Sequence, residues 1–180
     1  MQSISHGKKY GLATVAGLIS GCLVHTTLLA FGVSAIIKQN QQLFFVIKLF
    51  GAIYLLYLAY QVFRRKADIN VSDEGVAKKG VGQLFRQGFI MNVLNPKVTI
   101  FFLAFFPGFL FSDELSTVIQ FYVLGLLFML VSAIIFSLIA ILSGMISENI
   151  RRNSKIGVYL KWLQIIVFVG IATYLLFSDK

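Results

Sequence analysis

The sequence predicts an all-α integral membrane protein, and three observations support that prediction. Hydrophobic residues make up 58% of the 180 residues and charged residues only 13%, whereas a soluble domain has roughly 45 to 50% apolar and 25% charged residues. Five long apolar segments follow one another, and each reaches the roughly 20 residues that a helix needs to cross the hydrocarbon core. The alternating pattern of a membrane β-strand is missing from these segments, which leaves helices as the spanning structure.

The five helices are expected to form one transmembrane domain over residues 1–180. Their predicted ranges are residues 11–37, 43–63, 89–111, 115–146 and 157–177. The first range is too long for the apolar core of a cleaved signal peptide, so we interpret it as a retained helix. Residues 64–86 mix both charge signs with glycine and show no periodicity, which predicts a flexible cytoplasmic linker. Short connections after the first and third helices predict antiparallel neighbours.

Polar and small residues distinguish the first predicted helix. Ala13, Gly17 and Gly21 recur at every fourth position, a spacing that lets another helix backbone approach closely. His25 and Thr26 lie in the middle of the same helix. They are candidates for lining a polar path or accepting a proton, and hydrogen bonding to a neighbouring helix is the alternative.

The net charge of +9 is distributed unevenly along the chain. Basic residues precede the first helix and fill the connections after the second and fourth helices, which share one side of the membrane: Lys8, Lys9, Arg64, Arg65, Lys66, Lys78, Lys79, Arg86, Arg151, Arg152 and Lys155. By the positive-inside rule the N-terminus is cytoplasmic and the C-terminus is periplasmic or extracellular. Topology therefore accounts for the basic excess, and no nucleic-acid partner is expected.

The third predicted helix contains the stretch NVLNPKVTIFF, residues 92–102. Pro96 has no N–H and its ring crowds the carbonyl of Asn92, so the helical ladder breaks there. Asn95 as N-cap and Pro96 as first residue are also the signals of a new helix start. Lys97 would then lie about 12 Å along the span, near the midplane. A charge there costs at least about 2.5 to 3.5 kcal/mol, so Lys97 should face a cavity or a partner.

The break predicts a binding site for an anion such as a carboxylate. Free amides at the start of the second half-helix, its positive dipole end and the Lys97 ammonium would all attract one. An ordinary proline kink is the alternative, in which the asparagines satisfy the freed carbonyls and the lysine extends its charge towards the interface.

The remaining chemistry argues against an enzyme, a metal site and a cofactor. Cys22 is the one cysteine, so the chain offers no disulfide framework and no metal cluster built from thiols. Motifs for metal-dependent hydrolysis, phosphate binding or a nucleophile elbow are missing from the sequence. The carboxylates all fall in predicted loops or chain ends: Asp68, Asp73, Glu74, Asp113, Glu114, Glu148 and Asp179.

The order of helix lengths predicts an incomplete inverted repeat. The first and fourth helices are long and the second and fifth shorter, and members of each pair cross the membrane in opposite directions. Such repeats are common in secondary transporters. The third helix would open the second repeat, which leaves the first repeat without its opening helix.

Three stretches of the chain resemble the LysE/RhtB family of amino-acid exporters. They are GLATVAGLISGCLVHTTLLAFGVSAI (residues 11–36), IKLFGAIYLLYLAYQVFR (47–64) and FRQGFIMNVLNPKVTIFFLAFFPGF (85–109). The resemblance implies a proton-driven exporter of amino acids or related carboxylates in the bacterial inner membrane, with six helices in two inverted repeats. Asn95, Pro96 and Lys97 match the family's central motif, and Asn92 and Pro107 match its surroundings. The expected substrate-binding residues are Asn92, Asn95, Pro96 and Lys97.

This chain departs from the family pattern at its N-terminus. Family members begin with a further helix carrying a Pro-Gly-Pro motif, whereas residues 1–12 resemble the loop that follows it. A misassigned start is one reading, and a truncated, non-transporting subunit or fragment that associates with full-length homologues is the other. The expected partners are a small amino acid or related carboxylate and the lipid bilayer, with a homo-oligomer left open.

Overall fold

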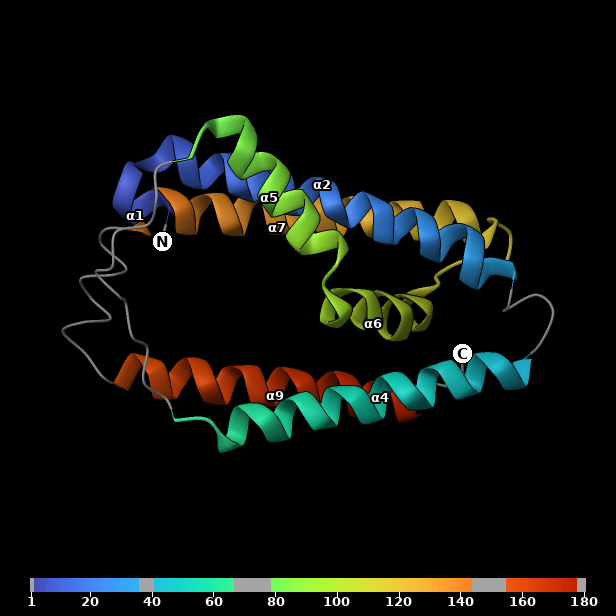
Figure 1. Cartoon of the computed structure of the whole chain (residues 1–180). Helices are drawn as coiled ribbons and strands as arrows, with labels where there is room; N and C mark the ends of the chain where they lie inside the picture. Colours follow the sequence, from blue (N-terminus) through green and yellow to red (C-terminus); the bar gives the residue numbers. More distant parts are fainter. Residues whose placement is uncertain (1, 36–40, 67–78, 144–154, 178–180) are drawn as a thin grey trace.

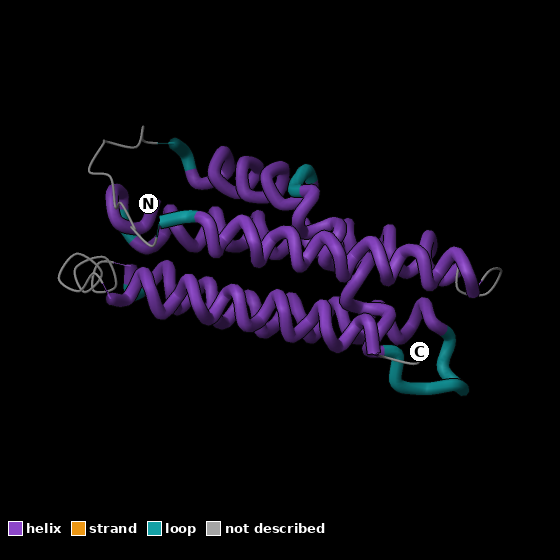
Figure 2. Tube along the Cα trace, turned by 90° about the horizontal axis from the view of Figure 1, so that it is seen from below, coloured by secondary structure: helices purple, strands orange, loops and turns teal. Residues whose placement is uncertain are grey.

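The computed structural model describes residues 2–35, 41–66, 79–143 and 155–177, and these residues are almost wholly helical (Figures 1 and 2). In chain order the elements are α1 (Gln2–His6), α2 (Lys8–Leu28), the π-helical turn η1 (Leu29–Val33), α4 (Gln41–Arg64), α5 (Val81–Val93), α6 (Pro96–Phe105), the 3-10 turn η2 (Phe106–Phe109), α7 (Thr117–Ile141) and α9 (Lys155–Phe177).

The described helices provide up to five membrane spans. Four of them are long and apolar enough to cross a membrane by themselves: Lys8–Val33, Gln42–Arg64, Thr117–Ile141 and Ile156–Phe177. The fifth span is a bent pair, Val81–Val93 and Pro96–Phe109, whose halves meet at 54°. The prediction of an all-α membrane protein is therefore confirmed, with four spans, or five if the bent pair crosses the membrane as one.

The helices form two layers with α6 between them (Figure 1). In one layer α2 packs along α5 and α7, and in the other α4 packs along α9. α6, which lies between the two layers, contacts α4 of the second layer. The buried core is correspondingly divided. One apolar cluster includes Leu29, Phe102 and Phe121, and the other includes Leu55, Ala104 and Leu175.

The contact between α2 and α5 depends on glycine. A Cβ atom added at Gly17 would collide with the Phe85 carbonyl group, and one added at Gly88 would collide with the Thr14 carbonyl oxygen. The two backbones can approach so closely only because neither position carries a side chain. The close packing predicted for the glycine positions of the first helix is therefore confirmed.

The start of α5 corrects the predicted linker. α5 begins at Val81, so residues 81–86 of the predicted 64–86 linker are helical and the predicted start at Phe89 is wrong. Gln83 Oε1 accepts a hydrogen bond from the Gly80 amide at 3.1 Å, which caps the helix there. Leu84, Gly88 and Asn92 then bury one face of α5.

The N-terminal stretch also differs from the prediction of a loop. Residues Gln2–His6 form α1, which is followed by Gly7 with φ 98°, a conformation that favours glycine. The predicted helix ends at residues 37 and 146 lie outside the described residues. The other predicted ends lie within a few residues of those in the structure.

A buried glutamine holds the turn between η2 and α7. Gln120 Oε1 accepts hydrogen bonds from the Phe111 and Ser112 amides at 2.7 and 3.0 Å. Gln120 Nε2 donates to the Ser112 and Leu115 carbonyl oxygens at 2.7 and 2.8 Å. Its side chain therefore supplies the partners that the turn lacks in its own backbone.

Candidate functional site

The break in the fifth span has the local geometry that the sequence predicts. α5 ends at Val93 and α6 begins at Pro96. Asn95 has an extended backbone (φ −83°, ψ 106°), and its Oδ1 atom accepts a hydrogen bond from the Lys97 amide at 3.0 Å. It is thus an N-cap, with proline at the first helical position.

The amides at this helix start are already used, which corrects the expectation of free donors. Asn95 N donates to the Asn92 carbonyl, Pro96 has no N–H, and Lys97 N is taken by the cap. The Val98 and Thr99 amides both donate to the Asn95 carbonyl at 3.1 Å. The cap and the tightened first turn therefore provide acceptors for these amides. Binding of an anion at this helix start would depend on the Lys97 side chain and the helix dipole.

The Asn92 carbonyl, which loses its usual helical donor at the proline, has a second partner from another helix besides the Asn95 amide. In an unbroken helix the Asn92 carbonyl would accept from the amide at position 96, which proline lacks. Instead, Nε2 of His25 in α2 lies 3.1 Å from the Asn92 oxygen. A carbonyl can only accept, so Nε2 carries the proton. His25 is 3% exposed and its ring lies 5.5 Å from that of Phe102, centroid to centroid.

Asn92 itself faces α2. Its Nδ2 lies 3.6 Å from Cys22 Sγ, and a Cβ atom at Gly21 would lie 2.7 Å from the Asn92 Cβ. Two buried atoms of this contact, His25 Nδ1 and Asn92 Oδ1, have no hydrogen-bond partner among the described residues. The four predicted substrate-binding residues therefore divide, with Asn92 in the α2 contact and Asn95, Pro96 and Lys97 at the start of α6.

Thr26, the other candidate path residue, is buried at 1% exposure. Its Oγ1 donates to the Cys22 carbonyl at 2.9 Å within α2. A Cβ atom at Gly125 of α7 would collide with its side chain. These contacts agree with helix packing, and the pathway role of His25 and Thr26 stays a prediction.

Lys97 extends to the α4–α9 layer. Its Nζ lies 4.6 Å from the centre of the Phe168 ring, within the range of a cation–π contact. The residue also lines a cavity of about 490 Å³ between the end of α4 and the first half of α9. This position agrees with the prediction that Lys97 faces a cavity or a partner, and its role in substrate binding stays a prediction.

The polar lining of this cavity is strongly basic. Lys97 is joined there by Arg65, Lys66 and Lys161, and by the amides of Gln61 and Gln164. The remaining lining residues are Leu58, Val62, Gly157 and Leu160, so no described lining residue is acidic. These cations come from segments far apart in the chain, so no local sequence pattern indicates that they form a group. We call this group of lining residues the basic cavity.

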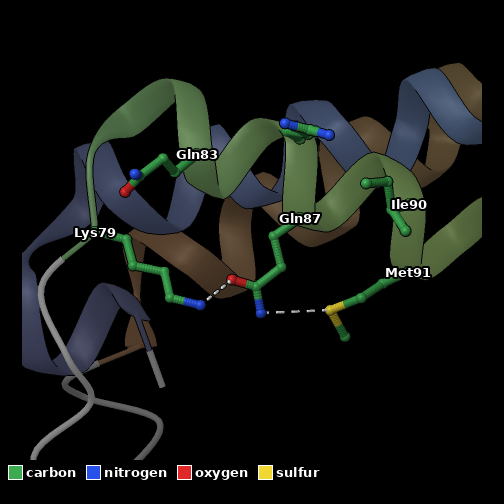
Figure 3. A pocket seen from close by; sticks show the side chains of 6 residues that line it. Lys79, Gln83, Gln87, Ile90 and Met91 are labelled. Carbon is green, nitrogen blue, oxygen red and sulfur yellow. Dashed lines mark hydrogen bonds between the residues drawn. The ribbon is translucent and has the colours of Figure 1, made fainter.

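A second depression lies along the outer face of α5 (Figure 3). Lys79 Nζ donates to Gln87 Oε1 at 2.9 Å, and Gln87 Nε2 lies 3.8 Å from Met91 Sδ. Its lining residues come only from α5 and the residue two positions before it. No second described element encloses it, so it lacks the walls of a binding pocket.

Up to five helical spans, one broken at an Asn-Pro-Lys sequence beside a basic cavity, define a multi-pass membrane protein of the transporter class. Comparison with protein-family models gives a match to the LysE type translocators over residues 1–179. The chain belongs to this family, as its three resembling stretches predict. The family consists of translocators and not of enzymes.

Curated relatives agree with the family. The chain is 28% identical to the homoserine/homoserine lactone efflux protein of Salmonella typhimurium over 149 residues, which cover 83% of this chain and 71% of the relative. It is 29% identical to an uncharacterized membrane protein of Vibrio cholerae over 148 residues, covering 82% and 71%. No solved structure gives a significant match.

Proposed function

We propose that the chain exports small amino-acid-like carboxylates across the bacterial inner membrane, driven by the proton gradient. The observation that carries the proposal is the Lys97 ammonium, which leaves the helix break and faces the basic cavity. A lysine in a membrane span is costly unless it serves a partner or a path. A substrate carboxylate is a partner of opposite charge, and efflux in the named relatives supports the direction of transport.

The distribution of charge along the bundle supports a cytoplasmic opening of the basic cavity. Basic residues flank the start of α2, the end of α4 and the start of α5, which all lie at the left in Figure 1: Lys8, Lys9, Arg64, Arg65, Lys66, Lys79 and Arg86. Asp113 and Glu114 lie in the turn at the opposite end. By the positive-inside rule the basic end is cytoplasmic, so the basic cavity opens towards the cytoplasm.

Efflux from loaded cells tests the proposal. Cells producing the chain are loaded with labelled homoserine, and its loss is followed with and without an uncoupler. We expect efflux that an uncoupler stops and that Lys97→Ala abolishes. Lys79→Ala is the matched control, because it removes a lysine outside the basic cavity. Full efflux by a Lys97→Ala protein present at normal level in the membrane would refute the role of Lys97.

A further inference from the structure

The basic cavity has a deep end and a mouth. At the deep end the Lys97 ammonium lies over Phe168, which is in the middle of α9. At the mouth Arg65 and Lys66 directly follow the last residue of α4, and both are exposed. The lining therefore extends from exposed cations at the end of α4 to the half-buried Lys97 at the start of α6.

Lys161 is positioned by two contacts at this mouth. Its Nζ donates to the Arg65 carbonyl oxygen at 2.7 Å and lies 5.6 Å from the centre of the Phe63 ring. An ammonium has three N–H donors, and the hydrogen bond uses one of them. The contact also joins the end of α4 to α9, so the Lys161 charge and the Arg65 backbone keep a defined separation.

The charges of the cavity select among ligands. Gln61 and Gln164 add amides, but no described lining residue carries a negative charge. A carboxylate gains from every cation it approaches, whereas a ligand with only an ammonium is repelled by each of them. The planar guanidinium of arginine suits a carboxylate particularly well because it can donate two parallel hydrogen bonds.

We propose that the basic cavity is a capture site for small carboxylates, in which Arg65 and Lys161 bind the carboxylate at the cytoplasmic mouth before it reaches Lys97. This inference rests on the proposed export function and deepens it. Under this inference Arg65 and Lys161 select the ligand at the mouth. A ligand with a free carboxylate enters, and one whose carboxylate is esterified is rejected.

Transport into inverted membrane vesicles tests the capture site, because their cytoplasmic face is outside. The uptake of labelled homoserine is measured against its concentration for the unaltered chain and for Arg65→Gln and Lys161→Gln. Removing one cation in a solvated cavity should raise the half-saturating concentration roughly fivefold to tenfold and leave the maximal rate nearly unchanged. The rise should shrink at high salt, because ions screen exposed charges.

Arg64→Gln is the matched control. Arg64 is the neighbour of Arg65, and the substitution removes the same charge, but its guanidinium lies 5.9 Å from the Tyr60 ring and does not line the cavity. The expected half-saturating concentration is unchanged. Equal effects of Arg64→Gln and Arg65→Gln would overturn the proposal, since the general surface charge would then be responsible.

The lactone of homoserine supplies the ligand test. It lacks the carboxylate and keeps the ammonium, so it should compete with homoserine at least tenfold more weakly, a difference of about 1.4 kcal/mol. Equal competition by the lactone would overturn the capture site while homoserine uptake that needs Lys97 would still support export. The absence of any homoserine transport would instead refute the export function. The lipid composition of the vesicles supplies a further test. If Arg65→Gln and Lys161→Gln alter uptake only in vesicles that contain an anionic lipid, the cavity binds a lipid headgroup and the proposal is also overturned.

Discussion

Replacing His25 with leucine tests how the helix break is stabilised. His25 Nε2 donates to the Asn92 carbonyl across the interface of α2 and the bent span. Leucine has a similar apolar bulk but no donor, so the substitution removes the hydrogen bond and keeps most of the packing. We expect the break to be less well fixed to α2 and the folded protein to be less stable.

The size of the expected loss of stability depends on the hydrogen bonds that the Asn92 carbonyl keeps in His25→Leu. A buried acceptor left without a partner costs about 1 to 3 kcal/mol, but the Asn92 oxygen keeps the Asn95 amide at 3.0 Å. The loss should therefore lie near the lower limit, consistent with the average of about 0.6 kcal/mol for hydrogen bonds between membrane helices. Loss of the contact between the His25 and Phe102 rings, whose centroids are 5.5 Å apart, adds roughly 0.5 to 1.5 kcal/mol to this destabilisation. Together they predict a loss of about 1 to 2 kcal/mol.

Unfolding of the purified protein in detergent by increasing SDS measures this loss. His25→Gln is the matched variant, because an amide can still donate to the carbonyl, and it should recover part of the stability that leucine loses. Homoserine efflux provides a second readout and should fall in the same order. If His25→Leu and the unaltered protein unfold at the same SDS fraction, the hydrogen bond does not stabilise the break and the reasoning is refuted.

Three further predictions concern the scaffold, and the same unfolding measurement checks each of them. Gln120→Leu strips four hydrogen bonds from the turn before α7, so we expect a loss of about 2 to 4 kcal/mol, and no change in stability would contradict the role of Gln120. Gly88→Ala forces a methyl group onto the Thr14 carbonyl and should cost roughly 1 to 3 kcal/mol; an unaffected protein would show that α2 and α5 are not in close contact. Asn95→Ala removes the cap of α6 and should cost about 1 kcal/mol, whereas Asn95→Ser should keep most of the stability; equal losses in both variants would argue against capping.

Signals that act within a few residues allow the break to be predicted from the sequence. The capping oxygen of Asn95 and the missing amide of Pro96 decide the chain path locally, and the structure places the helix start at the predicted residue. The start of α5 escapes prediction because Gln83, Arg86 and Gln87 interrupt its apolar pattern. Its buried face is made by only one leucine together with glycine and asparagine.

Contacts between distant segments cannot be obtained from one sequence in this way. His25 and Asn92 are 67 positions apart, and Lys161 and Arg65 are 96 positions apart. Nothing in either segment indicates its partner. The expectation of free amides at the helix start is wrong for a different, local reason, because the side chain and the carbonyl of Asn95 accept hydrogen bonds from them.

The two halves of the broken span differ in what they pack against, because α5 packs mainly on α2 whereas α6 contacts both layers. α5 is locked to α2 at Gly17 and Gly88, whereas α6 meets α4 where a Cβ atom at Gly51 would collide with Ala104. If the layers move relative to one another, the backbone torsions of Leu94 and Asn95 must absorb the rotation, as hinge residues do. Pro96 fixes its own φ at about −65°, which removes one degree of freedom at the joint. The same residue that interrupts the helix thus restricts the directions in which the two halves can swing.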